Sequence, residues 1–167
     1  MIIIGIDPGL SRLGYGIINI QGQATTLLTC GVHQTKPATP MAERLHAHYQ
    51  KLAKLLKEYT PEAIALEKIF VHINPSSALK LGYVRGLVYL LAGENGVSLF
   101  EYAAKEIKAG ITGYGGADKT QVLQMVLREF PQARIKYDDE SDALALALHH
   151  AHNQRFQRLV AQADQRH

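Results

Sequence analysis

The first 32 residues constrain the fold more than any other part of the sequence. Three apolar runs, at residues 2–6, 13–20 and 25–32, are separated by short segments rich in Gly, Pro, Ser or Gln. Short connections of this kind join antiparallel neighbours, whereas a parallel crossover needs about a dozen residues or more. The sequence therefore predicts an antiparallel three-stranded meander at the start of the chain.

Helical and extended patterns alternate through the rest of the chain. Apolar residues recur at helical spacing over 40–59 and 76–92, and short apolar segments follow these helices at 63–66 and 97–100. Further helical patterns cover 105–109, 118–130 and the chain from about Ser141 onward. Strand, helix and strand in this order favour parallel pairing. We therefore predict an α/β fold, with a five-stranded mixed sheet flanked by helices on both faces.

Size and composition fit one globular domain. Domains usually hold about 100 to 200 residues, so a chain of 167 residues has room for one core. We assign residues 1–152 to this domain and residues 153–167 to a short polar tail. The formal net charge of +3 permits a polyanionic partner without requiring one. The single cysteine, Cys30, excludes a disulfide framework.

The sequence gives no sign of membrane insertion or secretion. No apolar stretch approaches the roughly 18 residues that a membrane-spanning helix needs. The start, MIIIGID, lacks the basic segment and the cleavage site of a secretion signal. We therefore expect a cytoplasmic protein with no membrane partner.

Two acidic residues follow predicted strands directly. Asp7 comes after the first strand and precedes a Pro-Gly turn, and Glu67 ends the strand at 63–66 in the same way. If the two strands are neighbours, both carboxylates meet at one edge of the sheet, where like charges are costly unless a cation joins them. A divalent metal ion is the natural counter-charge. Taken singly, each acid is also explained as a turn residue or a solvated strand end.

A second acidic group opens the last predicted helix, in the segment YDDESDALALALHHAH. Asp139 and Asp142 are three residues apart and therefore project from one face of a helix. Capping and the helix dipole account for one or two acids at such a position. They do not account for all four of Asp138, Asp139, Glu140 and Asp142. The acids of both groups together indicate a metal site.

The histidines near the end of the same helix give a weaker signal. His149 and His150 point about 100° apart on a helix. The chain has no cysteine near them that would complete a zinc ligand set with His152. We predict no structural metal there.

Several separate motifs resemble the RuvC family of Holliday-junction resolvases. These motifs are GIDPG at the first strand end, the glutamate of IALEKIF, the segment NPSSALKLGYVRG and the terminal DESDALALAL. They follow the family's order at similar spacing over roughly residues 1–152. The resemblance implies an RNase H-like fold and a structure-specific endodeoxyribonuclease of DNA recombination and repair.

The resemblance also implies the catalytic residues and the cofactor. Asp7, Glu67, Asp139 and Asp142 match the family's catalytic positions, which bind two Mg²⁺ ions per subunit, with Mn²⁺ as a substitute. Asp138 lies beside the third position and leaves an ambiguity of one residue, although the spacing to Asp142 favours Asp139. Two such ions can activate a water and stabilise the leaving 3′-oxygen during in-line attack on a phosphodiester, which leaves a 5′-phosphate.

DNA binding requires cations near the acids and side chains that suit contacts to bases. The residues that we expect to bind DNA are Phe70, Asn74, Ser76, Lys80, Arg85, Lys105, Lys108 and Lys119. By resemblance, Lys108 and Lys119 match basic positions near the active site, and Phe70 matches an aromatic side chain presented to unpaired bases. A solvated helix face is the alternative for each lysine, and a core position is the alternative for Phe70.

The resemblance further implies a homodimer that nicks two strands of like polarity in a four-way junction, together with the RuvA–RuvB branch-migration complex as a partner. The helix at 76–92 is apolar around most of its circumference. Such a helix offers a dimer interface, but a deeply packed core helix has the same pattern.

Three other classes of protein compete with this interpretation. An ATPase of the actin and sugar-kinase type also opens with a strand, a glycine-rich turn and an aspartate, but it needs two such domains. A binding module without catalysis would lack one or more of the four acids, and none is missing here. An RNase H-like nuclease that acts on another nucleic acid remains the alternative function.

Overall fold

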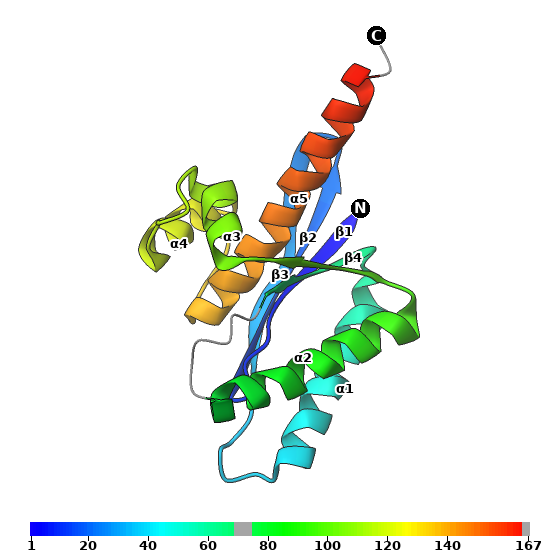
Figure 1. The fold of residues 1–167 in the computed structure, drawn as a ribbon, viewed down its shortest axis with the longest axis vertical. Helices are drawn as coiled ribbons and strands as arrows, with labels where there is room; N and C mark the ends of the chain where they lie inside the picture. The colour runs from blue at the N-terminus through cyan, green and yellow to red at the C-terminus, as the bar shows by residue number, and fades with distance from the viewer. Residues whose placement is uncertain (69–74, 165–167) are drawn as a thin grey trace.

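Helices cover both faces of a central sheet in the computed structural model, which describes residues 1–68 and 75–164 (Figure 1). Helices α1 (Met41–Tyr59) and α2 (Pro75–Asn95) lie on one face of the sheet. Helices α3 (Ala104–Thr112), α4 (Lys119–Glu129) and α5 (Asp138–Asp164) lie on the other face. The predicted arrangement in layers is therefore confirmed.

The sheet has five strands in the order β3-β2-β1-β4-β5. Strands β1 (Ile2–Asp7), β2 (Arg12–Gln21) and β3 (Ala24–Gln34) form the predicted antiparallel meander. Strand β4 (Ala63–Glu67) pairs in parallel with β1, and β5 (Ser98–Tyr102) pairs in parallel with β4. Because β1 and β4 are parallel neighbours, their carboxyl ends meet at one edge of the sheet.

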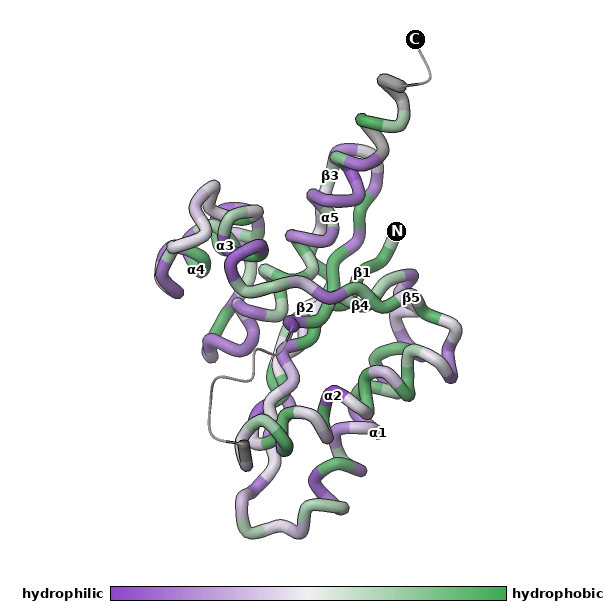
Figure 2. Tube along the Cα trace, viewed as in Figure 1, coloured by the Kyte–Doolittle hydropathy of each residue, from purple (hydrophilic) through white to green (hydrophobic). Residues whose placement is uncertain are grey.

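The central strands are apolar on both faces. In β1, Ile3 faces the core under α5 and Ile4 faces the core under α1 and α2. In β4, Ala65 faces the core under α5 and Leu66 faces the core under α1 and α2. Figure 2 shows the result as apolar colour along β1 and β4. A strand that is buried on both faces reads as a continuous apolar run, which is why 63–66 was recognisable as a strand.

Three glycines let α5 lie directly against β1 and β2. Gly5 and Gly16 are register partners, and Gly14 lies opposite the last residue of β1. A Cβ atom on Gly5 would overlap the carbonyl oxygen of Ala143, and a Cβ atom on Gly14 would overlap the carbonyl oxygen of Asp139. The missing side chains therefore bring the first turns of α5 next to the end of β1.

The last helix begins earlier than the sequence predicted. It starts at Asp138 and not at about Ser141. The carboxylate of Glu140 accepts hydrogen bonds from the main-chain amides of Lys136 and Tyr137, at 2.5 and 3.0 Å. This contact closes the first turn, so the acidic residues lie inside the helix and not ahead of it.

The same helix runs on through most of the polar tail, to Asp164. Arg155 anchors the extension because its guanidinium donates to the carbonyl of Gln23, at 3.0 Å, and to the hydroxyl of Thr25, at 2.9 Å. The predicted division at residue 152 therefore falls within α5. Among the described residues, no helix is long and apolar enough to cross a membrane.

Candidate active site

Three elements bring the predicted acids to one edge of the sheet. Asp7 ends β1, Glu67 ends β4, and Asp139 and Asp142 lie at the start of α5. Asp7, Glu67 and Asp142 line a cavity of about 400 Å³. The other residues that line it come from α3, α4 and α5: Ala104, Ile107, Lys108, Lys119, Val122, Ala145 and Leu146.

Burial and mutual repulsion favour the protonated forms of Asp7, Glu67 and Asp142. Burial, followed by the charges of Asp142, Asp139 and Glu67, raises the pKa of Asp7 from 3.8 to about 7. Burial also raises the pKa of Glu67 and of Asp142, and the charge of Asp142 adds to the shift at Glu67. Acids that resist ionisation in this way form a site where an additional cation is stabilising.

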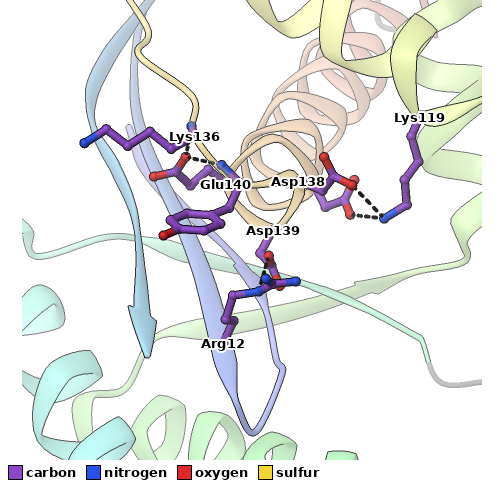
Figure 3. Close-up of polar contacts among 8 residues, drawn as sticks. Arg12, Lys119, Lys136, Asp138, Asp139 and Glu140 are labelled. Atoms are coloured by element: carbon purple, nitrogen blue, oxygen red, sulfur yellow. Dashed lines mark hydrogen bonds and ion pairs between the residues drawn. The ribbon is translucent and has the colours of Figure 1, made fainter. Parts of the chain in front are cut away.

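Two protein cations already neutralise part of the cluster (Figure 3). Lys119 Nζ lies 3.3 Å from Asp142 Oδ2 and 3.8 Å from Asp138 Oδ2. The charge of Asp142 raises the pKa of Lys119, so the ammonium group stays charged there. On the other side of the helix start, Arg12 Nε lies 3.0 Å from Asp139 Oδ2, although the two groups are not aligned as a hydrogen bond.

The structure distinguishes Asp139 from its neighbour Asp138. The side chain of Asp138 is 71% exposed, whereas that of Asp139 is 16% exposed. The charge of Asp139 contributes to the raised pKa of Asp7. These observations favour Asp139 as the third acid of the cluster and leave Asp138 as a partner of Lys119 on the solvent side.

The acids do not form a closed ligand set in this arrangement. Among residues 1–68 and 75–164, no three His, Cys, Asp or Glu side chains form a ready-made metal-binding group. Asp139 is instead paired with Arg12, and Asp142 with Lys119. The donors are nevertheless carboxylate oxygens, the ligands that hard divalent ions prefer. The residues therefore fit divalent ions once the two ion pairs open.

The turn after β1 is fixed by α1. Arg44 donates to the hydroxyls of Thr35 and Ser11, both at 3.0 Å, and the Thr35 hydroxyl donates to the carbonyl of Leu10 at 2.6 Å. His48 Nε2 lies 2.8 Å from the same carbonyl. A partly buried network of this kind restrains the chain that follows the first acid.

Two of the predicted DNA-binding lysines lie in the acidic cavity and two do not. Lys108 and Lys119 line the cavity. Lys105 is exposed one turn earlier on α3. Lys80 lies on α2 and lines a second hollow together with residues of the turn after β1, including Ser11.

The remaining predicted DNA-binding residues belong to α2 and the segment before it. Ser76 lies in the first turn of α2. Phe70 and Asn74 fall outside the described residues. The structure does not support Arg85 as a DNA contact, because its side chain is only 9% exposed and is paired with the carboxylate of Glu101.

His149 and His150 are core residues, 5% and 1% exposed. The Tyr102 hydroxyl and His150 Nδ1 form a hydrogen bond of 2.6 Å, and Asn153 Nδ2 lies 3.2 Å from His149 Nε2. Burial lowers the pKa of both imidazoles, that of His150 to about 4. Both rings are therefore neutral at physiological pH.

Arg12 and the glycines that admit α5 were missed in the sequence. The signal for the glycines was present, since Gly14 and Gly16 alternate along β2 and therefore share a face with their neighbour Gly5 in β1. The signal for Arg12 was its place between the turn after Asp7 and the next strand. Neither signal showed that the glycines and Arg12 would lie against α5.

Comparisons with known sequences agree with this geometry. The family model described as Crossover junction endodeoxyribonuclease RuvC matches residues 3–150. A protein of that name from Alkaliphilus oremlandii is 42% identical over 157 residues, which cover 93% of this chain and 96% of the relative. Another from Azorhizobium caulinodans is 43% identical over 151 residues, which cover 90% of this chain and 89% of the relative.

Comparison with solved structures extends the likeness to the fold. The structure described as Thermus thermophilus RuvC in complex with Holliday junction substrate superposes with a TM-score of 0.88 at 33% sequence identity. The match covers 94% of this chain and 96% of that chain. The family model, the sequences of the relatives and the superposed fold agree: this chain belongs to the RuvC family of crossover junction endodeoxyribonucleases and has its RNase H-like fold.

Proposed function

We propose that this protein is a structure-specific endodeoxyribonuclease that resolves Holliday junctions in DNA recombination and repair. The observation that carries the proposal is the gathering of Asp7, Glu67, Asp139 and Asp142 at one sheet edge, beside a cavity that also contains lysines. Family membership supports the substrate, because the Thermus thermophilus relative is described in complex with a Holliday junction. Cleavage consists of paired symmetrical nicks in strands of like polarity.

Divalent cations fit the acidic cluster, with two Mg²⁺ ions per subunit as the expected cofactor and Mn²⁺ as a substitute. Asp7, Glu67 and Asp142 would hold them, together with Asp139 once it leaves Arg12. Bound ions would supply an activated water and stabilise the leaving 3′-oxygen of in-line hydrolysis, which leaves a 5′-phosphate. Because the pKa of Asp7 is raised to about 7, metal binding releases a proton near neutral pH.

The lysines of the cavity have two tasks in this proposal. Without metal, Lys119 offsets the charges of Asp142 and Asp138. When a divalent cation takes Asp142, the ammonium group of Lys119 becomes available to a DNA phosphate. Lys108 lines the same cavity, and its charge opposes the burial that raises the pKa of Glu67. Both lysines thus bring positive charge to a site that must accept a polyanion.

A homodimer would match the two-fold symmetry of a four-way junction. Helix α2 buries Val84 and Val88 against the sheet but leaves Leu79 and Leu90 more than half exposed. The exposed face alternates large apolar side chains with glycines above which the space is open: Leu79, Gly82, Tyr83, Gly86, Leu90 and Gly93. We propose that this α2 face packs against a second copy. Family membership also makes the RuvA–RuvB complex the expected partner.

A synthetic four-way junction with one labelled strand at a time tests the function. With Mg²⁺, we expect nicks at symmetrical positions in two strands of like polarity, and products that DNA ligase can reseal because they carry 5′-phosphates. A linear duplex of the same sequence is the control. Equal cutting of the duplex would favour the alternative, an RNase H-like nuclease for another nucleic acid.

The variant Asp7→Asn ties the activity to the acidic cluster. It removes one charge and keeps the shape of the side chain, so the fold is preserved. We expect cleavage to be abolished while the junction is still bound in the absence of metal. Cleavage at the wild-type rate would remove Asp7 from the mechanism.

A further inference from the structure

Arg85 is a buried cation whose partners lie in three different elements. It belongs to α2, and its side chain is 9% exposed. Its guanidinium pairs with the carboxylate of Glu101 in β5 and donates a hydrogen bond to the main-chain carbonyl of Glu67 at the end of β4. It also lies over the ring of Tyr89, with the guanidinium carbon 5.9 Å from the ring centre.

Arg85 reaches the end of β4 from the face opposite the acidic cavity. Alternate side chains of a strand point to opposite faces. Leu66 packs in the core under α2, so the Glu67 side chain points to the α5 side, where it lines the cavity. Arg85 instead binds the Glu67 carbonyl from the α2 side. The acid and its support thus lie on opposite faces of one strand end.

The sheet also holds this strand end, through the pairing of Glu67 with Tyr102 in β5. The amide of Lys68 donates to the carbonyl of Tyr102 at 2.8 Å, just beyond the last register pair of β4 and β5. Strand β4 itself ends at Glu67. The hydrogen bond from Arg85 adds a side-chain support to this strand end and helps to determine where the Glu67 main chain, and with it the carboxylate, lies.

The same guanidinium is linked to the exposed face of α2. Gly86 and Leu90 belong to that face, and Tyr89, which is 47% exposed, lies beside Leu90 at its border. Because the Arg85 guanidinium lies over the Tyr89 ring, a partner helix that orders this ring also favours one position of the guanidinium. Contact on the outer face of α2 is in this way transmitted to the strand end that carries an acid of the cavity.

We propose that Arg85 is a positioning residue that couples packing on the α2 face to the placement of the Glu67 carboxylate. The inference rests on the proposed function, in which Glu67 holds a metal ion and α2 is the dimer interface. It assigns Arg85 a role in catalysis without contact to DNA. It also gives a physical reason why a subunit docked on its partner would bind metal better than an isolated one.

The test compares Arg85→Met with the wild type by single-turnover junction cleavage over a Mg²⁺ titration and by calorimetric Mn²⁺ binding without DNA. Loss of an outer support of a metal ligand typically lowers affinity or rate about 10- to 100-fold. We expect a loss of that size in Mn²⁺ affinity and in the cleavage rate at low Mg²⁺, with junction affinity changed by less than about threefold. Arg85→Lys, which keeps one hydrogen bond, should recover part of the loss.

Val88→Ala is the control for loss of stability alone. Val88 is buried one turn further along α2 and packs in the same core. Its truncation should lower the melting temperature but leave Mn²⁺ affinity and cleavage unchanged well below that temperature. If Val88→Ala reproduces the effects of Arg85→Met, Arg85 is only a structural residue and the proposal is overturned.

A double-mutant cycle with Tyr89→Leu tests the coupling itself. This change keeps an apolar residue on α2 and removes the ring over Arg85. We expect it to weaken Mn²⁺ binding about two- to threefold in the wild type and not in Arg85→Met, because coupled residues are non-additive. Equal effects in both backgrounds would overturn the coupling. If the wild type shows no Mg²⁺-dependent junction cleavage, the proposed function fails, and this inference fails with it.

Discussion

The two ends of the buried part of α5 carry titratable groups whose pKa values burial shifts in opposite directions. At its start, burial raises the pKa of Asp142, and that of the neighbouring Asp7 in β1 rises to about 7. Further along, burial lowers the pKa of His149 and of His150, the latter to about 4. Both groups are therefore held toward their neutral forms, although only one of them opens onto a cavity.

The difference lies in the partners of the two groups. The histidines contact uncharged groups, with His150 bonded to Tyr102 and stacked near Phe100. The charges of the acids repel one another, and two cations, Lys119 and Arg12, pair with two of them. The imidazole of His150 at one end is satisfied by its own fold, whereas the charges at the acidic end are only partly offset. Strain of the second kind is typical of functional sites.

The largest expected effect on stability is at the satisfied end. His150→Ala removes the hydrogen bond to Tyr102 and leaves a space beside Phe100. We expect a loss of about 3 kcal/mol in the free energy of unfolding, or roughly 6 to 12 °C in melting temperature. Chemical denaturation and calorimetry measure both quantities. A loss below about 0.5 kcal/mol would show that this end of α5 is not a structural core.

At the acidic end, we expect a substitution to raise the free energy of unfolding and not to lower it. Folding raises the pKa of Asp7, so the folded state binds an extra proton, and this group makes the protein less stable as pH rises from about 4 to 7. Asp7→Asn removes that penalty. We expect it to stabilise the metal-free protein by on the order of 2 kcal/mol at pH 8, with little effect near pH 4. The same destabilisation at both pH values would contradict the repulsive cluster.

The pH dependence of stability distinguishes the histidine end of α5 from its acidic end. Folding lowers the pKa of His150, so its contribution is complete above pH 6.5 and is lost as pH falls toward 4. When the pH is lowered from 7 to 4.5, the free energy of unfolding should therefore fall in both proteins, but by about 1 to 2 kcal/mol less in His150→Phe than in the wild type. Thermal melts at these two pH values, with Asp7→Asn as background, test the expectation. Equal acid sensitivity in the two proteins would count against a buried neutral imidazole.

The smallest expected effect concerns Arg12, which forms an ion pair with Asp139 in the absence of metal. Arg12→Gln removes a competitor of the metal ion without removing a ligand. We expect Mn²⁺ binding without DNA to tighten about two- to fivefold, because the exposed ion pair is worth only about 0.5 to 1 kcal/mol. Calorimetric titration measures the change, with Arg128→Gln on the exposed side of α4 as the control. Weaker binding would mean that Arg12 supports the acid and does not compete for it.

The parts of the fold that depend on local patterns were predictable. The meander followed from turn spacing, and the helix predicted at 118–130 is α4. Its start is fixed locally, because Asp118 and Gln121 bond to each other's main-chain amides. The predicted start of α5, at about Ser141, was wrong. The Glu140 side chain caps the helix by accepting hydrogen bonds from main-chain amides that precede it, so the helix begins before Ser141. Local propensity identifies a helix better than its first residue.

The parts that depend on long-range contacts were not predictable. All four acids could be named from the sequence, but the pairing of Asp139 with Arg12 joins opposite ends of the chain. Arg85 looked like a surface cation because nothing local shows that Glu101 lies beside it. The apolar pattern of α2 also could not show which of its faces is buried.

Single-turnover cleavage by two adjacent variants, Asp139→Asn and Asp138→Asn, tests the central claim most directly. Both lose one charge from the first turn of α5, and the two positions differ mainly in exposure. We expect Asp139→Asn to slow Mg²⁺-dependent junction cleavage at least about a thousandfold and Asp138→Asn by no more than about fivefold. Equal losses, or a larger loss in Asp138→Asn, would contradict the assignment of the acidic cluster.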